Sequence, residues 1–206
     1  MTAGTVVLWR HGQTEYNASL RLQGQSDIAL NATGRRQAAA AAEVLAALEP
    51  TRIITSDLVR AQETAQVLAG VAGVQATRDV RLRERSFGVW EGLTGAEIET
   101  GWPAEYAAWR RGQEPEGVGA ESRAGCGVRV AEAVEEVADE LDRDDVLVVV
   151  AHGAAITCGQ TVLLGLEPGG WFGFTGLENC RWSTMHPNRG REPAWRLAGY
   201  NIGAEE

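Results

Sequence analysis

Two short apolar segments, far apart in the chain, each run directly into a histidine followed by a glycine. TVVLW at residues 5–9 precedes RHG at 10–12, and VLVVV at 146–150 precedes AHG at 151–153. Unbroken apolar, β-branched runs of this length are typical of strands buried on both faces, as in parallel sheets. Open α/β sheets bind their ligands at the carboxyl ends of such strands. If the two strands are parallel neighbours, both histidines lie in one crevice at that edge.

Helical segments alternate with strand-like segments in the first third of the chain. Residues 31–48 are rich in helix formers and stop before Pro50, which predicts a helix that begins near Thr33. RIITS at 52–56 repeats the strand pattern, and a second helical stretch runs from 58 to about 70. This order predicts an α/β fold in three layers (α/β/α), with a mostly parallel central sheet and helices on both faces.

The middle of the chain predicts a small helical cap. Residues 79–85 have the pattern of a strand or an extended segment, and 88–95 are rich in turn formers. Residues 95–111 are predicted to be helical, whereas the glycine-rich stretch 112–119 is predicted to be a loop. We therefore expect a cap insertion at about 88–120.

The last third returns to the pattern of the first. An amphipathic helix is predicted at 122–141, before the strand at 146–150, and two shorter strands are predicted at 181–185 and 195–200. A chain of 206 residues is within the usual size of one globular domain. We expect a single domain that spans residues 1–206 and includes the cap.

Charge and composition exclude several classes of partner. The formal net charge is −9, and all 19 basic residues are arginines. Nucleic acids and anionic membranes select for basic faces, so neither is expected as a partner. No apolar stretch is long enough to cross a bilayer, and the N-terminus lacks the pattern of a secretion signal, so a cytoplasmic protein is expected. The three cysteines indicate neither a disulfide framework nor a zinc knuckle.

The pairing of two histidines is more informative than either one alone. The chain has three histidines, and we interpret His186 as structural. A core histidine bonded to the backbone is the alternative for His11 and for His152. Arg10 and Arg60 add positive charge to the predicted crevice, and Arg60 lies early in a helix, where unpaired N–H groups attract anions. The alternative for Arg60 is a solvated surface charge.

Five segments in a fixed order carry a resemblance to a known family. They are LWRHGQTEYN (8–17), RLQGQSDIALNATGRRQA (21–38), ITSDLVRAQETA (54–65), LRERSFGVWEGLT (82–94) and VVVAHGAAI (148–156). Together they resemble the histidine phosphatase superfamily, also called phosphoglycerate-mutase-like, over nearly the whole chain. The RHG triplet alone is a weak motif, and the order of all five makes the resemblance specific.

The resemblance implies a role for each catalytic residue. It makes His11 the nucleophile that forms a phosphohistidine and Glu84 the general acid and base, while Arg10, Arg60 and a protonated His152 offset the charge of the phosphoryl group. These roles agree with the chemistry, because a neutral imidazole attacks phosphorus and cationic groups stabilise the equatorial oxygens. The residues implied to bind phosphate are Arg10, His11, Asn17, Gln23, Gly24, Arg60, His152 and Gly153.

No metal and no cofactor are implied, because arginines supply the positive charge. Zinc ligation by His11 and His152 is the formal alternative, but the HxxxH or HExxH spacing that supports it is absent from the sequence. The expected partner is a small phosphorylated metabolite. A homodimer is implied by the family resemblance and by no residue pattern.

Within the family, the sequence favours a phosphatase over a mutase. The chain is shorter than the cofactor-dependent mutases, and it lacks lysine where mutases carry basic residues for the substrate carboxylate. Several segments, including GAESR at 119–123, are most similar to glucosyl-3-phosphoglycerate phosphatases. The alternatives are a broad phosphomonoesterase, an α-ribazole phosphatase, a sugar bisphosphatase, a cofactor-dependent phosphoglycerate mutase, or a catalytically silent relative that binds phosphorylated ligands.

Four aromatic residues in the predicted cap have two interpretations. Trp90, Trp102, Tyr106 and Trp109 either stack on a sugar in the leaving group or form the core of the cap. The core is the interpretation that the residue types favour, since large aromatic side chains are mostly buried.

Overall fold

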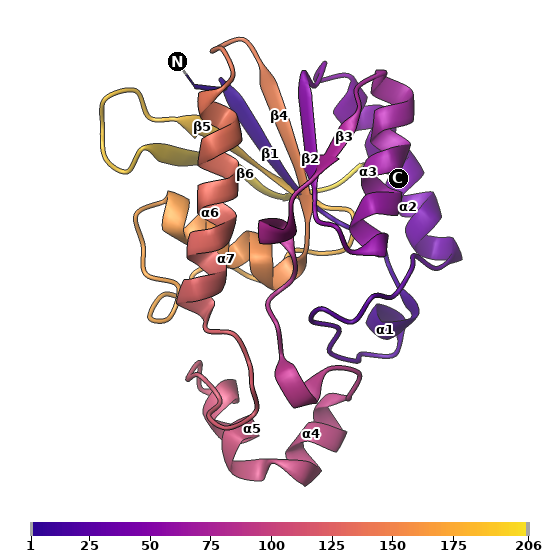
Figure 1. The fold of residues 1–206 in the computed structure, drawn as a ribbon, viewed down its shortest axis with the longest axis vertical. Coiled ribbons are helices and arrows are strands. Elements are labelled where there is room, and N and C mark those ends of the chain that lie inside the picture. The colour runs from indigo at the N-terminus through magenta and orange to yellow at the C-terminus, as the bar shows by residue number, and fades with distance from the viewer. Residues whose placement is uncertain (1, 205–206) are drawn as a thin grey trace.

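The computed structural model describes residues 2–204, and its centre is a six-stranded sheet (Figure 1). The spatial order is β3-β2-β4-β1-β5-β6; β1 to β4 are parallel to one another, while β5 pairs antiparallel with β1 and β6 antiparallel with β5. The mostly parallel sheet predicted from the sequence is therefore confirmed. The strands are β1 (Thr5–Arg10), β2 (Arg52–Thr55), β3 (Ala76–Arg78), β4 (Val146–Ala151), β5 (Trp182–Pro187) and β6 (Trp195–Ile202).

The two strands that end in histidines are direct neighbours. β1 and β4 pair in parallel register from Thr5 opposite Val146 to Arg10 opposite Ala151. The residue after each strand is a histidine, so the register brings His11 and His152 to the same edge of the sheet. The two strands are therefore parallel neighbours, which is the condition under which both histidines were expected to lie in one crevice.

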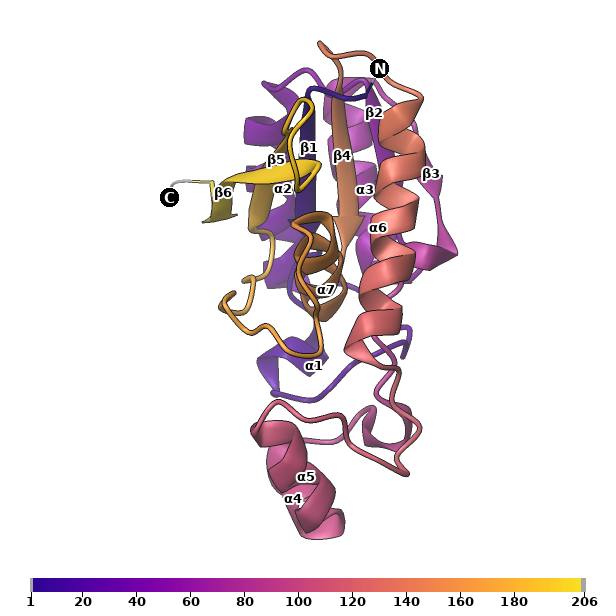
Figure 2. The ribbon, with the colours of Figure 1, turned by 90° about the vertical axis from the view of Figure 1, so that its left-hand side faces the viewer.

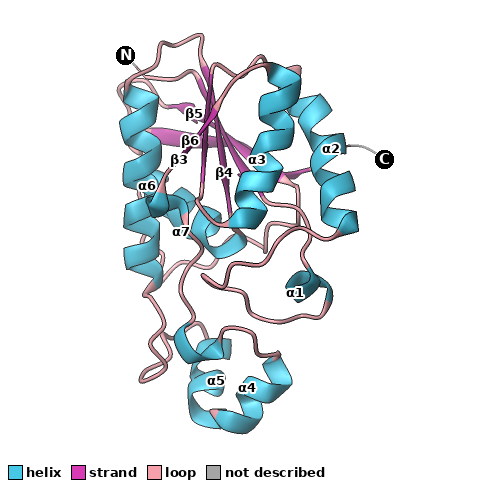
Figure 3. Cartoon of the chain, turned by 45° about the vertical axis from the view of Figure 1, so that its right-hand side comes forward, coloured by secondary structure: helices cyan, strands magenta, loops and turns pink. Residues whose placement is uncertain are grey.

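Helices cover both faces of the sheet (Figure 3). On one face lie α2 (Ala32–Ala46) and α3 (Val59–Ala72), and on the other lie α6 (Arg123–Asp139) and α7 (Gly153–Leu163). The side chains of β1 alternate between two apolar cores, because successive residues of a strand point to opposite faces. Val6 and Leu8 belong to the core under α6 and α7, whereas Val7 and Trp9 belong to the core under α2 and α3. The three-layer prediction is confirmed.

The helix boundaries follow from capping residues. The side chain of Asn31 accepts the N–H of Gly34 at the start of α2, and that of Ser122 accepts the N–H of Gly125 at the start of α6. Gly73, with φ of +70°, ends α3 in the left-handed conformation that glycine adopts without strain. Three elements were not predicted from the sequence: α7, α1 (Glu15–Ala18) and the 3₁₀ turn η2 (Gly88–Trp90).

Two local predictions are wrong. The strand or extended segment predicted at 79–85 contains no strand: β3 ends at Arg78, before that segment begins, and a 3₁₀ turn, η1 (Val80–Leu82), follows because the Asp79 side chain accepts the N–H of Arg81. The helix predicted at 95–111 is broken into α4 (Gly95–Gly101) and α5 (Pro103–Arg110). Pro103 causes the break, since proline lacks an N–H and disfavours a helical conformation in the residue before it.

Residues 88–120 lie at the end of the molecule farthest from the N-terminus, beyond the carboxyl ends of β1 and β4 (Figures 1 and 2). A separate apolar cluster holds this segment together: Phe87, Trp90, Ile98 and Val118 are buried, with Trp102, Tyr106 and Trp109 packed against them. Trp109 contacts Trp90 and Tyr106 at ring-centroid distances of 5.8 Å. All four aromatic residues thus belong to the core of the segment, as the residue types favour.

Within residues 2–204, no helix combines the length and the apolar character that a bilayer crossing requires.

Candidate active site

His11 is held in one defined tautomer. Its side chain is 2% exposed, and Nδ1 lies 2.7 Å from the carbonyl oxygen of Gly12. A carbonyl oxygen only accepts hydrogen bonds, so Nδ1 carries the proton and the lone pair is on Nε2. Nε2 accepts the Nε–H of Arg60 at 3.2 Å. Burial and the nearby Arg60 and Arg10 hold the pKa of His11 well below its ordinary value of 6.5, so the ring is neutral.

Gly12 is required by a close approach of two backbones. A Cβ on Gly12 would lie 2.4 Å from the carbonyl oxygen of Gly34, and a Cβ on Gly34 would lie 2.1 Å from the carbonyl oxygen of Gln13. The segment that follows β1 therefore packs directly against the first turn of α2. This contact fixes the backbone that carries His11 and supplies the carbonyl that sets its tautomer.

Arg60 is a buried cation. It lies in the first turn of α3, its side chain is 0% exposed, and it donates to the carbonyl oxygens of Ser26 and Gly24 at 2.8 Å each. Burial is the main cause that lowers its pKa to about 10, so it stays cationic at neutral pH. The surface-charge alternative for Arg60 is wrong.

Arg10 is the last residue of β1 and directly precedes His11. One Nη group donates to the carbonyl oxygen of Leu177, and the buried Nε has no partner among residues 2–204. Burial lowers the pKa of Arg10 from its usual value, with the charge of Glu84 opposing that effect. An unpaired N–H on a buried guanidinium is a free donor for an anion.

His152 is the most complete sign of a ligand site. Its side chain is fully buried, and neither ring nitrogen has a hydrogen-bond partner in the described part of the chain. Its ring centroid lies 5.1 Å from that of His11. Burial, then Arg60 and His11, hold the pKa of His152 well below 6.5. The neighbouring positive charge opposes protonation of His152 until an anion is bound, so the protonated His152 expected beside a phosphoryl group stays a prediction.

Glu84 accepts three backbone N–H groups. Its Oε1 accepts from Arg85 and Ala155 at 2.8 Å each, and its Oε2 accepts from Ala154 at 3.2 Å. Two of these donors belong to the first turn of α7, where unpaired N–H groups attract negative charge. The start of α7 thus holds the Glu84 carboxylate close to His152, the N-cap residue of that helix.

Arg129, which the sequence analysis missed, supports the backbone around Glu84. From α6 it donates to the carbonyl oxygens of Arg81 and Arg83 at 2.6 Å and to that of Glu84 at 3.1 Å. Its guanidinium also binds both carboxylate oxygens of Glu121 at 2.7 Å. No sequence motif indicated this role, because the contacts join segments about 45 residues apart.

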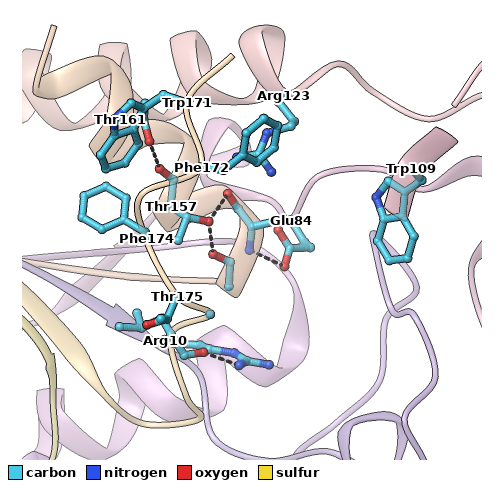
Figure 4. A pocket seen from close by; sticks show the side chains of 14 residues that line it. Arg10, Glu84, Trp109, Arg123, Thr157, Thr161, Trp171, Phe172, Phe174 and Thr175 are labelled. Atoms are coloured by element: carbon cyan, nitrogen blue, oxygen red, sulfur yellow. Dashed lines mark hydrogen bonds between the residues drawn. The ribbon is translucent and has the colours of Figure 1, made fainter. Parts of the chain in front are cut away.

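A cavity of about 590 Å³ opens beside this cluster (Figure 4). Arg10 and Glu84 lie in its wall together with Trp109 of α5 and Arg123 of α6. Aromatic side chains of the segment 171–177 form much of the remainder. The other lining residues are Gly153, Ala154, Thr157, Thr161, Trp171, Phe172, Phe174, Thr175, Gly176 and Leu177.

The remaining predicted site residues lie around Thr14. The Asn17 side-chain oxygen accepts from the backbone N–H and the hydroxyl of Thr14, and the Gln23 side-chain oxygen accepts from the same hydroxyl at 2.8 Å. Gly24, with φ of +51°, presents its carbonyl oxygen to Arg60. The oxygens of Asn17 and Gln23 are thus engaged, which directs their amide N–H groups to any remaining acceptor.

A comparison with known protein families shows which family has this sequence pattern. The family model of the histidine phosphatase superfamily (branch 1) matches residues 6–202.

The chain belongs to the histidine phosphatase superfamily.

Individual relatives agree with that assignment. A glucosyl-3-phosphoglycerate phosphatase of Mycobacterium tuberculosis (strain ATCC 25618 / H37Rv) is 39% identical over 100% of this chain and 97% of its own length. A solved mycobacterial glucosyl-3-phosphoglycerate phosphatase in complex with VO3 is 40% identical, with a TM-score of 0.88, over 97% of this chain and 99% of that one. A phosphoserine phosphatase from Entamoeba histolytica in complex with 3-phosphoglyceric acid is 28% identical, with a TM-score of 0.83, over 96% of both chains. The predicted activity class, a phosphatase, is confirmed.

Two further features of this histidine phosphatase were not found from the sequence. Asn179 donates to the His11 carbonyl oxygen at 3.1 Å and to the Asn17 side chain at 3.2 Å. Arg123 lies in GAESR, which supported the resemblance, yet nothing in the pattern placed its side chain in a cavity. Among the described residues, no group of three or more histidine, cysteine, aspartate or glutamate residues has a metal-binding arrangement.

Proposed function

We propose that this phosphatase hydrolyses phosphomonoesters through a phosphohistidine on Nε2 of His11. The main support is the tautomer of His11: its Nδ1 proton points at the Gly12 carbonyl, so the lone pair is on Nε2, where it accepts the Nε–H of Arg60 in the ligand-free protein and attacks phosphorus once the ester is bound. In the first step the N–P bond forms, the bond from phosphorus to the ester oxygen breaks, and that oxygen takes a proton. In the second step water displaces the histidine and gives up a proton, so phosphate is released.

Positive charge in this site stabilises the transferring group. Arg60 is buried and Arg10 is half-buried, and the buried Nε of Arg10 is a donor for a phosphoryl oxygen with no partner among residues 2–204. His152 adds two unpaired ring nitrogens, and the charge of a bound dianion favours its protonation. Asn17, Gln23, Gly24 and Gly153 are proposed as further phosphate contacts. Donors that are already in place when charge develops give the main stabilisation that phosphoryl transfer requires.

Glu84 is proposed as the group that moves the proton. It lies in the cavity wall beside Arg10, on the side from which a leaving group departs. Oε1 accepts two N–H groups at 2.8 Å, whereas Oε2 accepts one at 3.2 Å. Oε2 is therefore the oxygen with capacity to carry the proton that goes to the leaving oxygen and returns from water.

The proposed substrate is glucosyl-3-phosphoglycerate or a close analogue. Support comes from relatives at 38–39% identity that carry this name and span almost the whole chain. The cavity also agrees with it, because Trp109, Trp171 and Phe174 offer aromatic surfaces against which a sugar ring packs.

We further propose one domain, residues 1–206, in which the cap at 88–120 covers the substrate, and a metal-independent enzyme that acts as a homodimer in the cytoplasm. Trp109 of the cap supports the covering role, since it lines the cavity. The buried Arg60 and the half-buried Arg10 support catalysis without a metal. The homodimer rests on the family resemblance.

The test is a comparison of histidine variants. His11→Ala is expected to abolish phosphate release and the acid-labile label trapped from a ³²P-labelled substrate, and EDTA is expected to leave the wild-type rate unchanged. The matched control is His186→Ala, because His186 bonds the Gly4 carbonyl at the opposite end of the sheet. Full activity of His11→Ala or loss of activity in EDTA contradicts the mechanism. Isomerisation of 3-phosphoglycerate that is faster than phosphate release assigns a mutase instead.

A further inference from the structure

We propose that Arg123 binds a carboxylate on the leaving group, and that the preferred substrates are phosphate esters of hydroxy acids. The proposal rests on the phosphatase function above and names the substrate class at the same site. Arg123 lines the same cavity as Arg10 and Glu84. Figure 4 shows Glu84 between the two arginines.

The Arg123 guanidinium is held in place by protein groups. Its Nε donates to the carbonyl oxygen of Pro168 at 2.6 Å, and its central carbon lies 4.7 Å from the ring centroid of Phe172. Stacking on an aromatic ring and one fixed hydrogen bond leave the two Nη groups as the free end of a planar fork. A fork of this kind matches the two oxygens of a carboxylate.

This guanidinium has no acidic partner between residues 2 and 204. Other arginines near the site do have one: Arg85 pairs with Glu114, and Arg129 pairs with Glu121. Glu114 is close to Arg123 as well, but it accepts the backbone N–H of Arg123 and gives its other oxygen to Arg85. In a chain with a net charge of −9, an unpaired cation in a cavity wall indicates an anionic ligand.

The number of cationic groups near His11 differs from the number near Arg123. This difference distinguishes a carboxylate from a second phosphate as the ligand of Arg123. Arg10, which lines the cavity, and Arg60 lie close to His11 and His152, and both ring nitrogens of His152 have no partner in the described part of the chain. Apart from Arg10, Arg123 is the only cation among the residues that line the cavity. One guanidinium balances the single charge of a carboxylate, whereas a phosphate dianion requires more donors. The leaving oxygen then lies between His11 and Arg123, within reach of Glu84.

The test compares two substrates that differ in the carboxylate alone. For 3-phosphoglycerate and glycerol 3-phosphate, the ratio of their kcat/KM values is measured in wild type, Arg123→Gln and Arg123→Lys. The ratio is expected to fall about 10- to 100-fold in Arg123→Gln, because a charge-assisted hydrogen bond is lost. In Arg123→Lys, which keeps the charge but loses the planar fork, the ratio is expected to lie between the wild-type value and the Arg123→Gln value. Arg36→Gln, an exposed arginine of α2, controls for net charge.

A ratio that changes less than about twofold in Arg123→Gln overturns the proposal, whether both rates fall or neither does. A loss confined to fructose 2,6-bisphosphate assigns Arg123 to a second phosphate and also overturns it. Calorimetric affinities of both ligands for the His11→Ala background provide the same ratio without turnover. If wild type hydrolyses no ester at all, the proposed function fails, and this binding ratio still decides the role of Arg123.

Discussion

The two halves of the active site are built in different ways. The His–Arg cluster (Arg10, His11, Arg60 and His152) comes from the ends of β1 and β4 and the first turn of α3, and three of its four side chains are almost completely buried. The leaving-group wall (Trp109, Arg123 and residues 171–177) comes from the cap, the first residue of α6 and a segment without regular structure. In this wall Phe172 is 52% exposed.

This difference separates chemistry from selectivity. Groups that act on phosphorus need positions defined to a fraction of an ångström, and packed strand ends with backbone hydrogen bonds supply them. Groups of the leaving-group wall lie in α5, at the start of α6 and in an irregular segment, all outside the central sheet, where sequence changes disturb the strands least. We therefore expect changes in the His–Arg cluster to affect all substrates alike, and changes in the leaving-group wall to depend on the substrate.

The largest expected effect is in the cluster. Arg60→Met is expected to lower kcat by about 100- to 1,000-fold for every ester, since it removes preorganised positive charge from the transition state. It also removes a cation that lowers the pKa of His11, so that pKa rises, as NMR titration of the ring would show. A loss that depends on the leaving group would contradict the division between the two halves.

Replacement of Arg129 tests whether catalysis depends on the hydrogen bonds that this residue makes to the backbone around Glu84. Arg129→Met is expected to lower kcat for alkyl phosphates by about 10- to 100-fold, because Glu84 loses its defined position. p-Nitrophenyl phosphate needs little proton donation and is expected to lose less. The thermal midpoint of the variant is measured in parallel. An equal loss for both esters would indicate a general structural role instead.

Two tryptophans of the cap provide a matched pair for the wall. Trp109 lines the cavity and Trp102 does not, although both pack in the same apolar cluster. Trp109→Ala is expected to raise KM for glucosyl-3-phosphoglycerate about 5- to 10-fold, from the loss of an aromatic contact of about 1 kcal/mol. Trp102→Ala is expected to destabilise the cap with little change in KM. Equal KM values for the two variants would remove Trp109 from substrate binding.

The smallest expected effect is on stability against pH. Burial and neighbouring arginines lower the pKa of His11 and His152 below 6.5 in the folded state, while the unfolded chain takes up protons near that value. The contribution of the two imidazoles to the free energy of unfolding is therefore highest above about pH 6.5. It decreases as pH falls below that value, because the unfolded chain takes up protons that the folded imidazoles do not. Urea midpoints at pH 7 and pH 5 are expected to differ less in His152→Gln than in wild type. A His186→Gln control keeps both imidazoles, and an identical pH response in all three proteins would contradict this origin.

Local patterns were sufficient to predict the layers of the fold and most of the chemistry. The apolar runs before His11 and His152 predict strands that are covered on both faces of the sheet. An unbroken apolar run places apolar side chains on both faces of its strand, and both faces must then be buried. Ordered motifs then implied the roles of Arg10, Arg60 and Glu84, which the structure brings to one edge of the sheet. The break at Pro103 was also visible in the sequence, and its effect on the helix was underestimated.

Other properties depend on contacts between distant segments, and only the tertiary structure decided them. The tautomer of His11 requires the Gly12 carbonyl and Arg60 together, and the neutral state of His152 requires burial beside Arg60. The contact of Arg129 with the Glu84 backbone and the position of Arg123 in the cavity wall both depend on how α6 packs in the fold. The reason is physical: composition and spacing determine which segments are buried, whereas charge states and free donors depend on what each buried group meets.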